Sequence, residues 1–247
     1  MIGPKLYEAP WQNLVKEGYI ANAKCFEILI PMTQLFYEQY ITERIDGLND
    51  IKNKKRLLET VNPYKYEICK ELVNVHRANG HKMIIFCDVV SAAKWYAEKL
   101  DAKGQLMSGD TKDDVRRTIL ENFTNDKVDM IVTTRVGDVG IDLPDANVAI
   151  QVSSSSGSRR QEAQRLGRVL RPKQGHNYAY FYSLTSKDTR EMEFAQRRQS
   201  IMKQNGYEVK VIPYQRIKRT LKGIRDKEDE MMLINDILTG KKIEKSY

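Results

Sequence analysis

Apolar residues between positions 62 and 212 follow two alternating patterns. One is a short continuous apolar run, as in KMIIFCD at 82–88, which is typical of a buried parallel strand. The other places apolar residues three or four positions apart, as in the stretch that opens with Asn62, a predicted N-cap, and Pro63. The predicted strands cover 82–88, 104–109, 128–134, 147–153, 178–184 and 207–212. The predicted helices cover 62–80, 91–100, 111–123, 158–171 and 188–206.

Strands that alternate with helices of this length predict an α/β fold, in which a mainly parallel sheet is covered by helices on both faces. Ligands of such sheets bind beyond the carboxyl ends of the strands. We therefore expect a functional site at the turns that follow four of the strands. These turns begin after Asp88, Ser108, Thr134 and Ser153.

The two flanks of this segment have a different pattern. Residues 1–61 contain one predicted helix and a basic run, KNKKR at 52–56, which is open to three interpretations: a solvated loop, a nuclear-import signal or a DNA contact. Residues 213–247 are mostly charged and contain a single apolar stripe. The predicted organisation is an α/β domain at 62–212 between an N-terminal region and a charged tail.

Composition narrows the class of protein only slightly. The 41 Lys and Arg residues exceed the 33 Asp and Glu residues, and the net charge of +8 points weakly to an anionic partner. Cys25, Cys69 and Cys87 are far apart and odd in number, so a reducing compartment fits best and no zinc spacing is present. No apolar run approaches the length of a membrane span, and the first residues lack the apolar core of a signal peptide, so no membrane partner is expected.

The stretch SRRQEAQRLGRVLR at 158–171 gathers five arginines around one glycine. As a helix it places Gln161, Gln164, Arg168 and Arg171 within an arc of about 80°, with apolar residues opposite. Gly167 costs roughly 1 kcal/mol of helix propensity, which is acceptable where a ligand or another backbone must approach closely. Two interpretations stay open: a solvated basic face, or a row of arginines that grips a phosphoryl group.

QRLGRVLR at 164–171 resembles motif VI of superfamily 2 helicases. With VGDVGIDLPDANVAIQ before it and SSSSGSRRQEA at its start, the longer string resembles the XPB helicases, the DNA translocase subunits of the transcription and repair factor TFIIH. The resemblance implies the C-terminal RecA-like lobe of such a helicase. The sequence contains no G-x-x-x-x-G-K-[ST] phosphate loop, so the resemblance further implies that an N-terminal RecA-like lobe holds most of the ATP and its Mg²⁺.

For the nucleotide, the resemblance assigns roles to five residues. Arg168 and Arg171 are expected to reach the triphosphate across the cleft between the lobes, and Gln164 to orient that row and couple it to the hydrolytic water. Asp142, in GIDLP, is expected to contact the ribose or these arginines, with Gly140 permitting close approach. From the residues alone, GIDLP is also consistent with a tight turn before Pro144.

For the nucleic acid, the resemblance implies contacts to strand phosphates at the turns named above. The expected residues are Thr133, Thr134, Ser108, Gly109, Gly137 and Asp88. The plainer alternatives are ordinary strand residues at the two threonines and a turn aspartate at Asp88. Residues 33–60 are the candidate for the thumb-like helical element of XPB-like proteins, by position rather than by motif.

The resemblance therefore implies a motor lobe that acts with 3′–5′ polarity in promoter opening and nucleotide excision repair, in the nucleus, with DNA, the first lobe and other TFIIH subunits as partners. Two alternatives remain open. One is a non-catalytic lobe that binds DNA or protein by itself, and the other is the C-terminal lobe of an RNA helicase, which shares these motifs.

Overall fold

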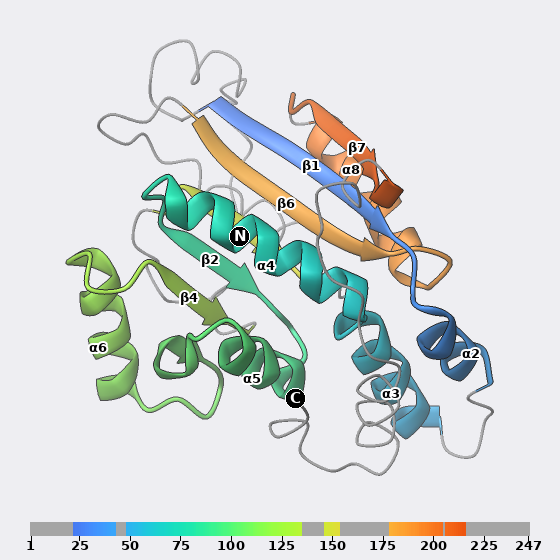
Figure 1. The fold of residues 1–247 in the computed structure, drawn as a ribbon, viewed down its shortest axis with the longest axis horizontal. Helices are drawn as coiled ribbons and strands as arrows, with labels where there is room; N and C mark the ends of the chain where they lie inside the picture. The colour runs from blue at the N-terminus through green and yellow to red at the C-terminus, as the bar shows by residue number, and fades with distance from the viewer. Residues whose placement is uncertain (1–21, 43–47, 135–145, 154–177, 205, 216–247) are drawn as a thin grey trace, which may run out of the picture.

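A seven-stranded parallel sheet forms the centre of the molecule (Figure 1). The computed structural model describes residues 22–42, 48–134, 146–153, 178–204 and 206–215. The strands are β1 (Asn22–Ile30), β2 (Met83–Phe86), β3 (Leu106–Met107), β4 (Met130–Thr133), β5 (Val148–Gln151), β6 (Tyr178–Ser186) and β7 (Val209–Pro213), in the spatial order β3-β4-β2-β5-β6-β1-β7. The helices are α2 (Gln34–Thr42), α3 (Leu48–Thr60), α4 (Pro63–Ala78), α5 (Val90–Lys99), α6 (Asp113–Thr124) and α8 (Glu191–Gln204), with a 3₁₀ turn at Lys103–Gln105.

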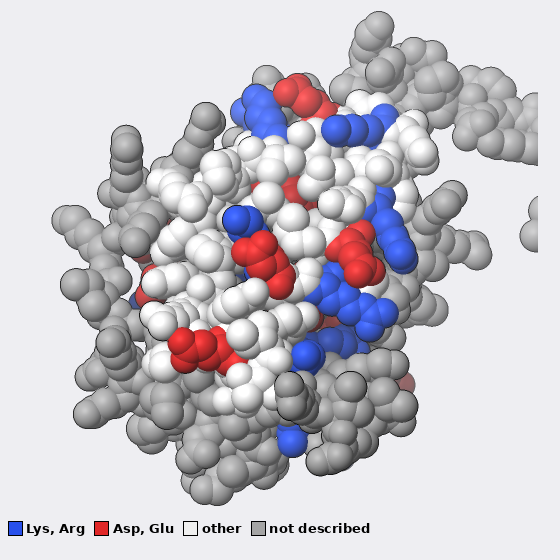
Figure 2. Space-filling model, turned by 90° about the vertical axis from the view of Figure 1, so that its right-hand side faces the viewer, with Lys and Arg blue, Asp and Glu red and all other residues white. Residues whose placement is uncertain are grey.

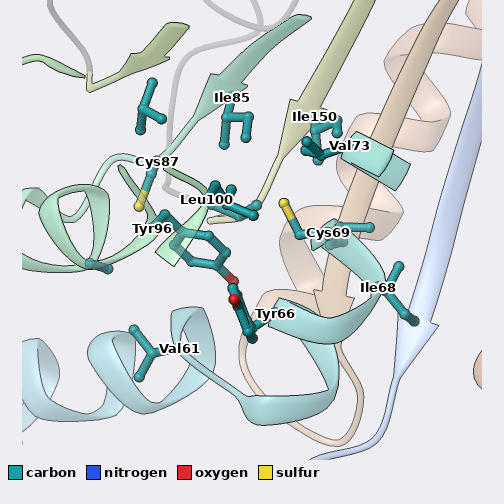
Figure 3. Packing of buried hydrophobic residues seen from close by; sticks show 14 of the residues in the cluster. Val61, Tyr66, Ile68, Cys69, Val73, Ile85, Cys87, Tyr96, Leu100 and Ile150 are labelled. Carbon is teal, nitrogen blue, oxygen red and sulfur yellow. The ribbon is translucent and has the colours of Figure 1, made fainter. Parts of the chain in front are cut away.

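Helices cover both faces of the sheet, which confirms the predicted α/β class. Successive side chains of a strand point to opposite faces, and β2 divides accordingly. Ile85 packs on the side of α4 and α5, in a cluster that also contains Cys69 and Tyr96 (Figure 3). Ile84 packs on the opposite side, in a cluster with residues of α6 and α8. The three inner strands β2, β4 and β5 are buried throughout, as continuous apolar runs predict.

The sequence patterns predict no strand before residue 82, yet β1 lies inside the sheet between β6 and β7. The apolar run of β1 is interrupted by Glu27, which is 1 % exposed. Arg198 of α8 neutralises this carboxylate with two guanidinium nitrogens, at 3.0 Å and 3.2 Å. The sheet therefore includes a strand from the region that precedes the predicted domain boundary at residue 62, a boundary that stays a prediction.

The helices before residue 62 pack onto the same body. Phe36 of α2 and Leu58 of α3 are fully buried in the cluster on the α4 side. The Tyr40 hydroxyl donates a hydrogen bond of 2.9 Å to the Glu59 carboxylate. The assignment of 33–60 as a thumb-like element stays a prediction, but α2 and α3 are anchored to the sheet-bearing body at these points.

Helix α4 begins as its sequence predicts. Asn62 is the N-cap, and its Oδ1 accepts a hydrogen bond from the Tyr64 backbone N–H at 3.2 Å, while Pro63 is the first helical residue. The Asn62 Nδ2 donates to the Pro31 carbonyl oxygen at 3.0 Å. At the other end, Gly80 has a φ of +68°, a conformation that glycine adopts without strain. The start of α4 is thus tied to the residue that follows β1, and the chain turns at Gly80 directly after the C-cap Asn79.

A pair of histidines near the end of α4 makes the stability of the fold dependent on pH. His76 Nδ1 lies 2.8 Å from His81 Nδ1, and His76 Nε2 lies 3.0 Å from the Tyr182 hydroxyl. Burial, and then the neighbouring His81 ring, lower the pKa of His76 from its usual 6.5 to about 4. Between these two pH values the unfolded chain binds more protons at this residue than the folded chain does, so stability is lost as the pH falls.

We expect the wild-type chain to lose about 1–2 kcal/mol more of its unfolding free energy than His76→Gln between pH 6.5 and pH 4. Urea unfolding at several pH values measures this difference, and the comparison of two chains cancels titrating groups that do not interact with His76. Parallel pH profiles for the two chains would show that His76 is not the residue responsible.

Candidate functional site

The carboxyl ends of β3, β4, β2 and β5 meet at one edge of the sheet, because these four strands are adjacent and parallel. Backbone hydrogen bonds continue past the ends of the strands. Thr134 N donates to Met107 O at 3.0 Å, Cys87 N donates to Thr133 O at 2.9 Å, and Val152 N donates to Phe86 O at 3.0 Å. This edge, which we call the carboxyl edge, brings together the four strand ends after which the predicted functional turns begin.

The turn after β2 is joined directly to the end of β5. The Asp88 backbone N–H donates to Ser153 Oγ at 2.6 Å, and Gln151 Nε2 donates to the Ser153 carbonyl oxygen at 3.2 Å. Ser153 is 2 % exposed and is the last described residue before the segment that contains the arginine row. Asp88, predicted to contact nucleic acid, therefore lies beside the start of that segment.

The turn after β3 is held by its own side chains and by Arg116 of α6. Ser108 N donates to Thr111 Oγ1 at 2.9 Å, and Arg116 Nη2 donates to the Thr111 carbonyl oxygen at 3.0 Å. The neighbouring Gly109 is exposed, whereas Ser108 is 4 % exposed. The turn thus presents backbone at its tip, and its hydroxyl groups bond to each other and to the turn itself.

Thr133 and Thr134 lie at the end of β4 and are buried, at 0 % and 4 % exposure. The Thr133 hydroxyl donates to the Thr134 carbonyl oxygen at 3.2 Å, and the Thr134 N–H is used in the bond to Met107. In this structure these two groups have partners inside the sheet. The predicted nucleic-acid contacts of the two threonines stay predictions.

Six of the predicted site residues lie outside the described residues. They are Gly137, Gly140, Asp142, Gln164, Arg168 and Arg171. The connections that carry them leave the sheet after β4 and after β5, and both strands end at the carboxyl edge. Their predicted roles in nucleotide and nucleic-acid binding stay predictions.

The structure adds a buried ion pair at the carboxyl edge that the sequence patterns do not predict. Lys65 Nζ of α4 donates to the Glu191 carboxylate of α8 at 2.6 Å and to the Val152 carbonyl oxygen at 3.2 Å. Glu191 also accepts a hydrogen bond of 2.8 Å from the Ser186 N–H at the end of β6. One signal in the sequence is that Lys65 precedes Ile68 and Cys69 by three and four positions, which places it on the apolar face of its helix.

Burial also changes the acidity of groups near this edge. Burial, and then the Glu191 charge, raise the pKa of Glu59 to about 7. Burial raises the pKa of the Cys87 thiol to about 12, and the three cysteines are buried and free. Among the described residues, no cluster of three or more His, Cys, Asp or Glu side chains could hold a metal ion.

The described surface in Figure 2 carries charges of both signs. On the side of the molecule shown in Figure 2, basic and acidic side chains are interspersed among uncharged ones. The described Lys and Arg side chains of this face therefore do not form a single basic field. Within the described part of the chain, no helix is both long and apolar enough to span a membrane.

Comparison with known proteins gives consistent matches. The family described as "ERCC3/RAD25/XPB C-terminal helicase" matches residues 14–246. The general transcription and DNA repair factor IIH helicase/translocase subunit XPB of Danio rerio is 48% identical over 218 residues, which cover 86% of this chain and 27% of that protein. The corresponding subunit XPB/SSL2 of Saccharomyces cerevisiae is 45% identical over 219 residues, or 87% of this chain and 25% of that protein. This chain thus spans about a quarter of the length of these relatives.

Solved structures match the fold at low identity. The C-terminal domain of the DEAD-box protein Dbp5 is 15% identical, with a TM-score of 0.54 over 83% of this chain and 98% of that domain. Saccharomyces cerevisiae Dbp5 bound to RNA and ADP BeF3 is 16% identical, with a TM-score of 0.55 over 87% of this chain and 45% of that protein. These likenesses confirm the predicted RecA-like lobe and concern the fold alone.

Proposed function

Because the chain belongs to the ERCC3/RAD25/XPB C-terminal helicase family, we propose that it is the second motor lobe of an ATP-dependent DNA translocase. The observation that carries the proposal is the identity of 44–48% to XPB subunits over at least 84% of the chain. The relatives are named as subunits of factor IIH in transcription and DNA repair. We extend to this chain their assembly with other factor IIH subunits and a location in the nucleus.

In the proposed mechanism, ATP and Mg²⁺ are bound mainly by the first lobe, and the cleft between the lobes closes on them. Arg168 and Arg171 then reach the triphosphate, where their guanidinium groups stabilise the charge that develops on the transferred phosphoryl group. Gln164 orients this row, and Asp142 contacts the ribose or the arginines, with Gly140 leaving room. These roles rest on the match between the family motif and the sequence.

The strand of DNA is proposed to run over the turns of the carboxyl edge. Gly109 is exposed at the tip of the turn after β3, where a backbone N–H is proposed to donate to a phosphate. Ser108, Asp88, Thr133, Thr134 and Gly137 complete the proposed set. Contacts to phosphates carry little sequence information, which suits a motor that must act on any duplex.

In the proposal, alternating closure and opening of the cleft between the lobes moves the protein along the DNA. With ATP bound, the two lobes hold the backbone of one strand at a fixed separation, and hydrolysis followed by release resets the second lobe. The bond between Asp88 N–H and Ser153 Oγ supports a direct link between the two functions, because it joins a proposed DNA turn to the strand that leads to the arginine row.

The experiment compares a protein that carries both lobes with the 247-residue chain alone. We expect the two-lobe protein to hydrolyse ATP faster with duplex DNA than with duplex RNA or with no nucleic acid. The isolated chain should show no ATPase activity and only weak, salt-sensitive DNA binding. Stimulation by RNA but not by DNA would favour an RNA helicase, and tight binding by the isolated chain would favour a non-catalytic binding lobe.

A further inference from the structure

The ammonium group of Lys65 is enclosed by protein on all sides. The side chains of Lys65 and Glu191 are 0% and 1% exposed, and the Nζ–Oε2 distance is 2.6 Å. Besides this carboxylate, the ammonium group binds the carbonyl oxygen of Val152, at 3.2 Å. The pair therefore reaches a backbone atom of the sheet and is more than a contact between two helices.

Stability is a weak reason for such a pair to be present. Removing an ammonium group and a carboxylate from water is costly, and well-packed apolar side chains of similar volume often serve a fold equally well. A buried lysine does offer three donors that an apolar residue lacks. The role of Lys65 therefore follows from the groups that accept hydrogen bonds from its ammonium group.

One of these donors binds the backbone where the chain leaves β5. Val152 directly follows the strand, and the segment that contains the arginine row begins two residues later. Glu191 is in turn fixed to the end of the next strand, because it accepts the Ser186 N–H at 2.8 Å. The Thr189 hydroxyl adds a further bond to the Ser186 carbonyl oxygen, at 2.7 Å.

The same exit has a second anchor on its other side, the bond from the Asp88 N–H to Ser153 Oγ. Consecutive residues, Val152 and Ser153, are thus held from α4 and from the turn after β2. Two anchors on adjacent peptides restrict both the position and the direction of the chain that follows.

We propose that Lys65 and Glu191 are positioning residues for catalysis, which fix the exit of β5 and so set the direction from which the arginine row approaches the nucleotide. This inference rests on the proposed function. Neither residue touches ATP or DNA in the proposal. They act through the backbone of Val152, and a displacement of about 1 Å at a catalytic group is enough to slow a reaction strongly.

The test replaces the pair with neutral residues in a protein that carries both lobes. In Lys65→Met with Glu191→Gln, the glutamine can still accept the Ser186 N–H, and the methionine fills the space of the lysine stem. The bond to Val152 is lost. We expect kcat of the DNA-stimulated ATPase to fall about ten- to a hundredfold, while KM for ATP and the affinity for DNA stay close to wild type.

The chain offers a matched control in the second buried pair of α8. Glu27 and Arg198 are each 1% exposed and are 3.0 Å apart, and they join α8 to β1 rather than to α4. Glu27→Gln with Arg198→Met therefore removes an equally buried pair and should leave kcat near wild type at a temperature where the protein is folded. A purely structural role for Lys65 would make the two double variants alike.

Each outcome has a distinct meaning. Wild-type kcat in the folded Lys65/Glu191 variant overturns the positioning role while the proposed function stands. Absence of DNA-stimulated ATPase in the wild-type two-lobe protein defeats the proposed function instead. If the double variant does not fold, Lys65→Met alone provides the comparison at a temperature where it is folded, since it removes the bond to Val152 and leaves the Glu191 carboxylate in place to accept the Ser186 N–H. A wild-type kcat there again overturns the proposal.

Discussion

Replacing Arg168 with alanine in a protein that carries both lobes should lower kcat of its DNA-stimulated ATPase by about 10³–10⁵-fold. A guanidinium group that engages the phosphoryl group mainly in the transition state affects kcat more than KM, and the proposal leaves most ATP binding to the first lobe. Single-turnover ATP hydrolysis with duplex DNA present measures the effect. Unfolding by heat should be unchanged.

Arg159→Ala is the matched control. Arg159 lies in the same arginine-rich stretch, but in the helix predicted for 158–171, at about 100° per residue, it falls on the opposite side from the row that contains Gln164 and Arg168. The substitution removes the same charge and should leave kcat within about threefold of wild type. Equal losses in both variants would indicate a general charge effect, and near-normal turnover in Arg168→Ala would remove its catalytic assignment.

The Arg198→Met substitution should lower the free energy of unfolding by about 3–5 kcal/mol. It leaves the carboxylate of Glu27, which is 1% exposed, without the guanidinium group that neutralises it. The Thr185 hydroxyl still donates a hydrogen bond to Glu27, but a single neutral donor does not replace a charge. Chemical denaturation of the 247-residue chain measures the loss.

The control for this prediction restores neutrality. In Arg198→Met with Glu27→Gln, the buried charge is gone and the amide can still accept from Thr185, so most of the lost stability should return. A double variant as unstable as the single one would show that packing of the arginine stem, rather than the unpaired carboxylate, is responsible.

The sequence patterns predict most of this fold because its strands are short, apolar and buried on both faces. β2, β4 and β5 each fall within a predicted strand. β1 is missed for an equally physical reason: its apolar run contains Glu27, and the partner that neutralises Glu27 is 171 positions away. A local pattern records the cost of a buried charge and carries no information about a distant partner.

The candidate site likewise has one feature that the sequence predicts and others that it does not. The meeting of four strand ends at one edge follows from the parallel sheet, so it is predictable once the strands are recognised. The bond between Asp88 and Ser153 joins residues 65 positions apart, and the pair of Lys65 and Glu191 spans 126 positions. Such contacts depend on how helices pack over the sheet, which hydrophobic spacing does not specify.

The place of β1 has a consequence for the way this chain acquires its structure. All nine of its residues pair with β6, and β6 and β7 are the last strands of the sheet to be synthesised. Loop closure over so much intervening chain is entropically costly and slows folding. During translation, both edges of β1 therefore stay unpaired until β6 and β7 have left the ribosome. We expect the nascent chain to need protection from aggregation until then.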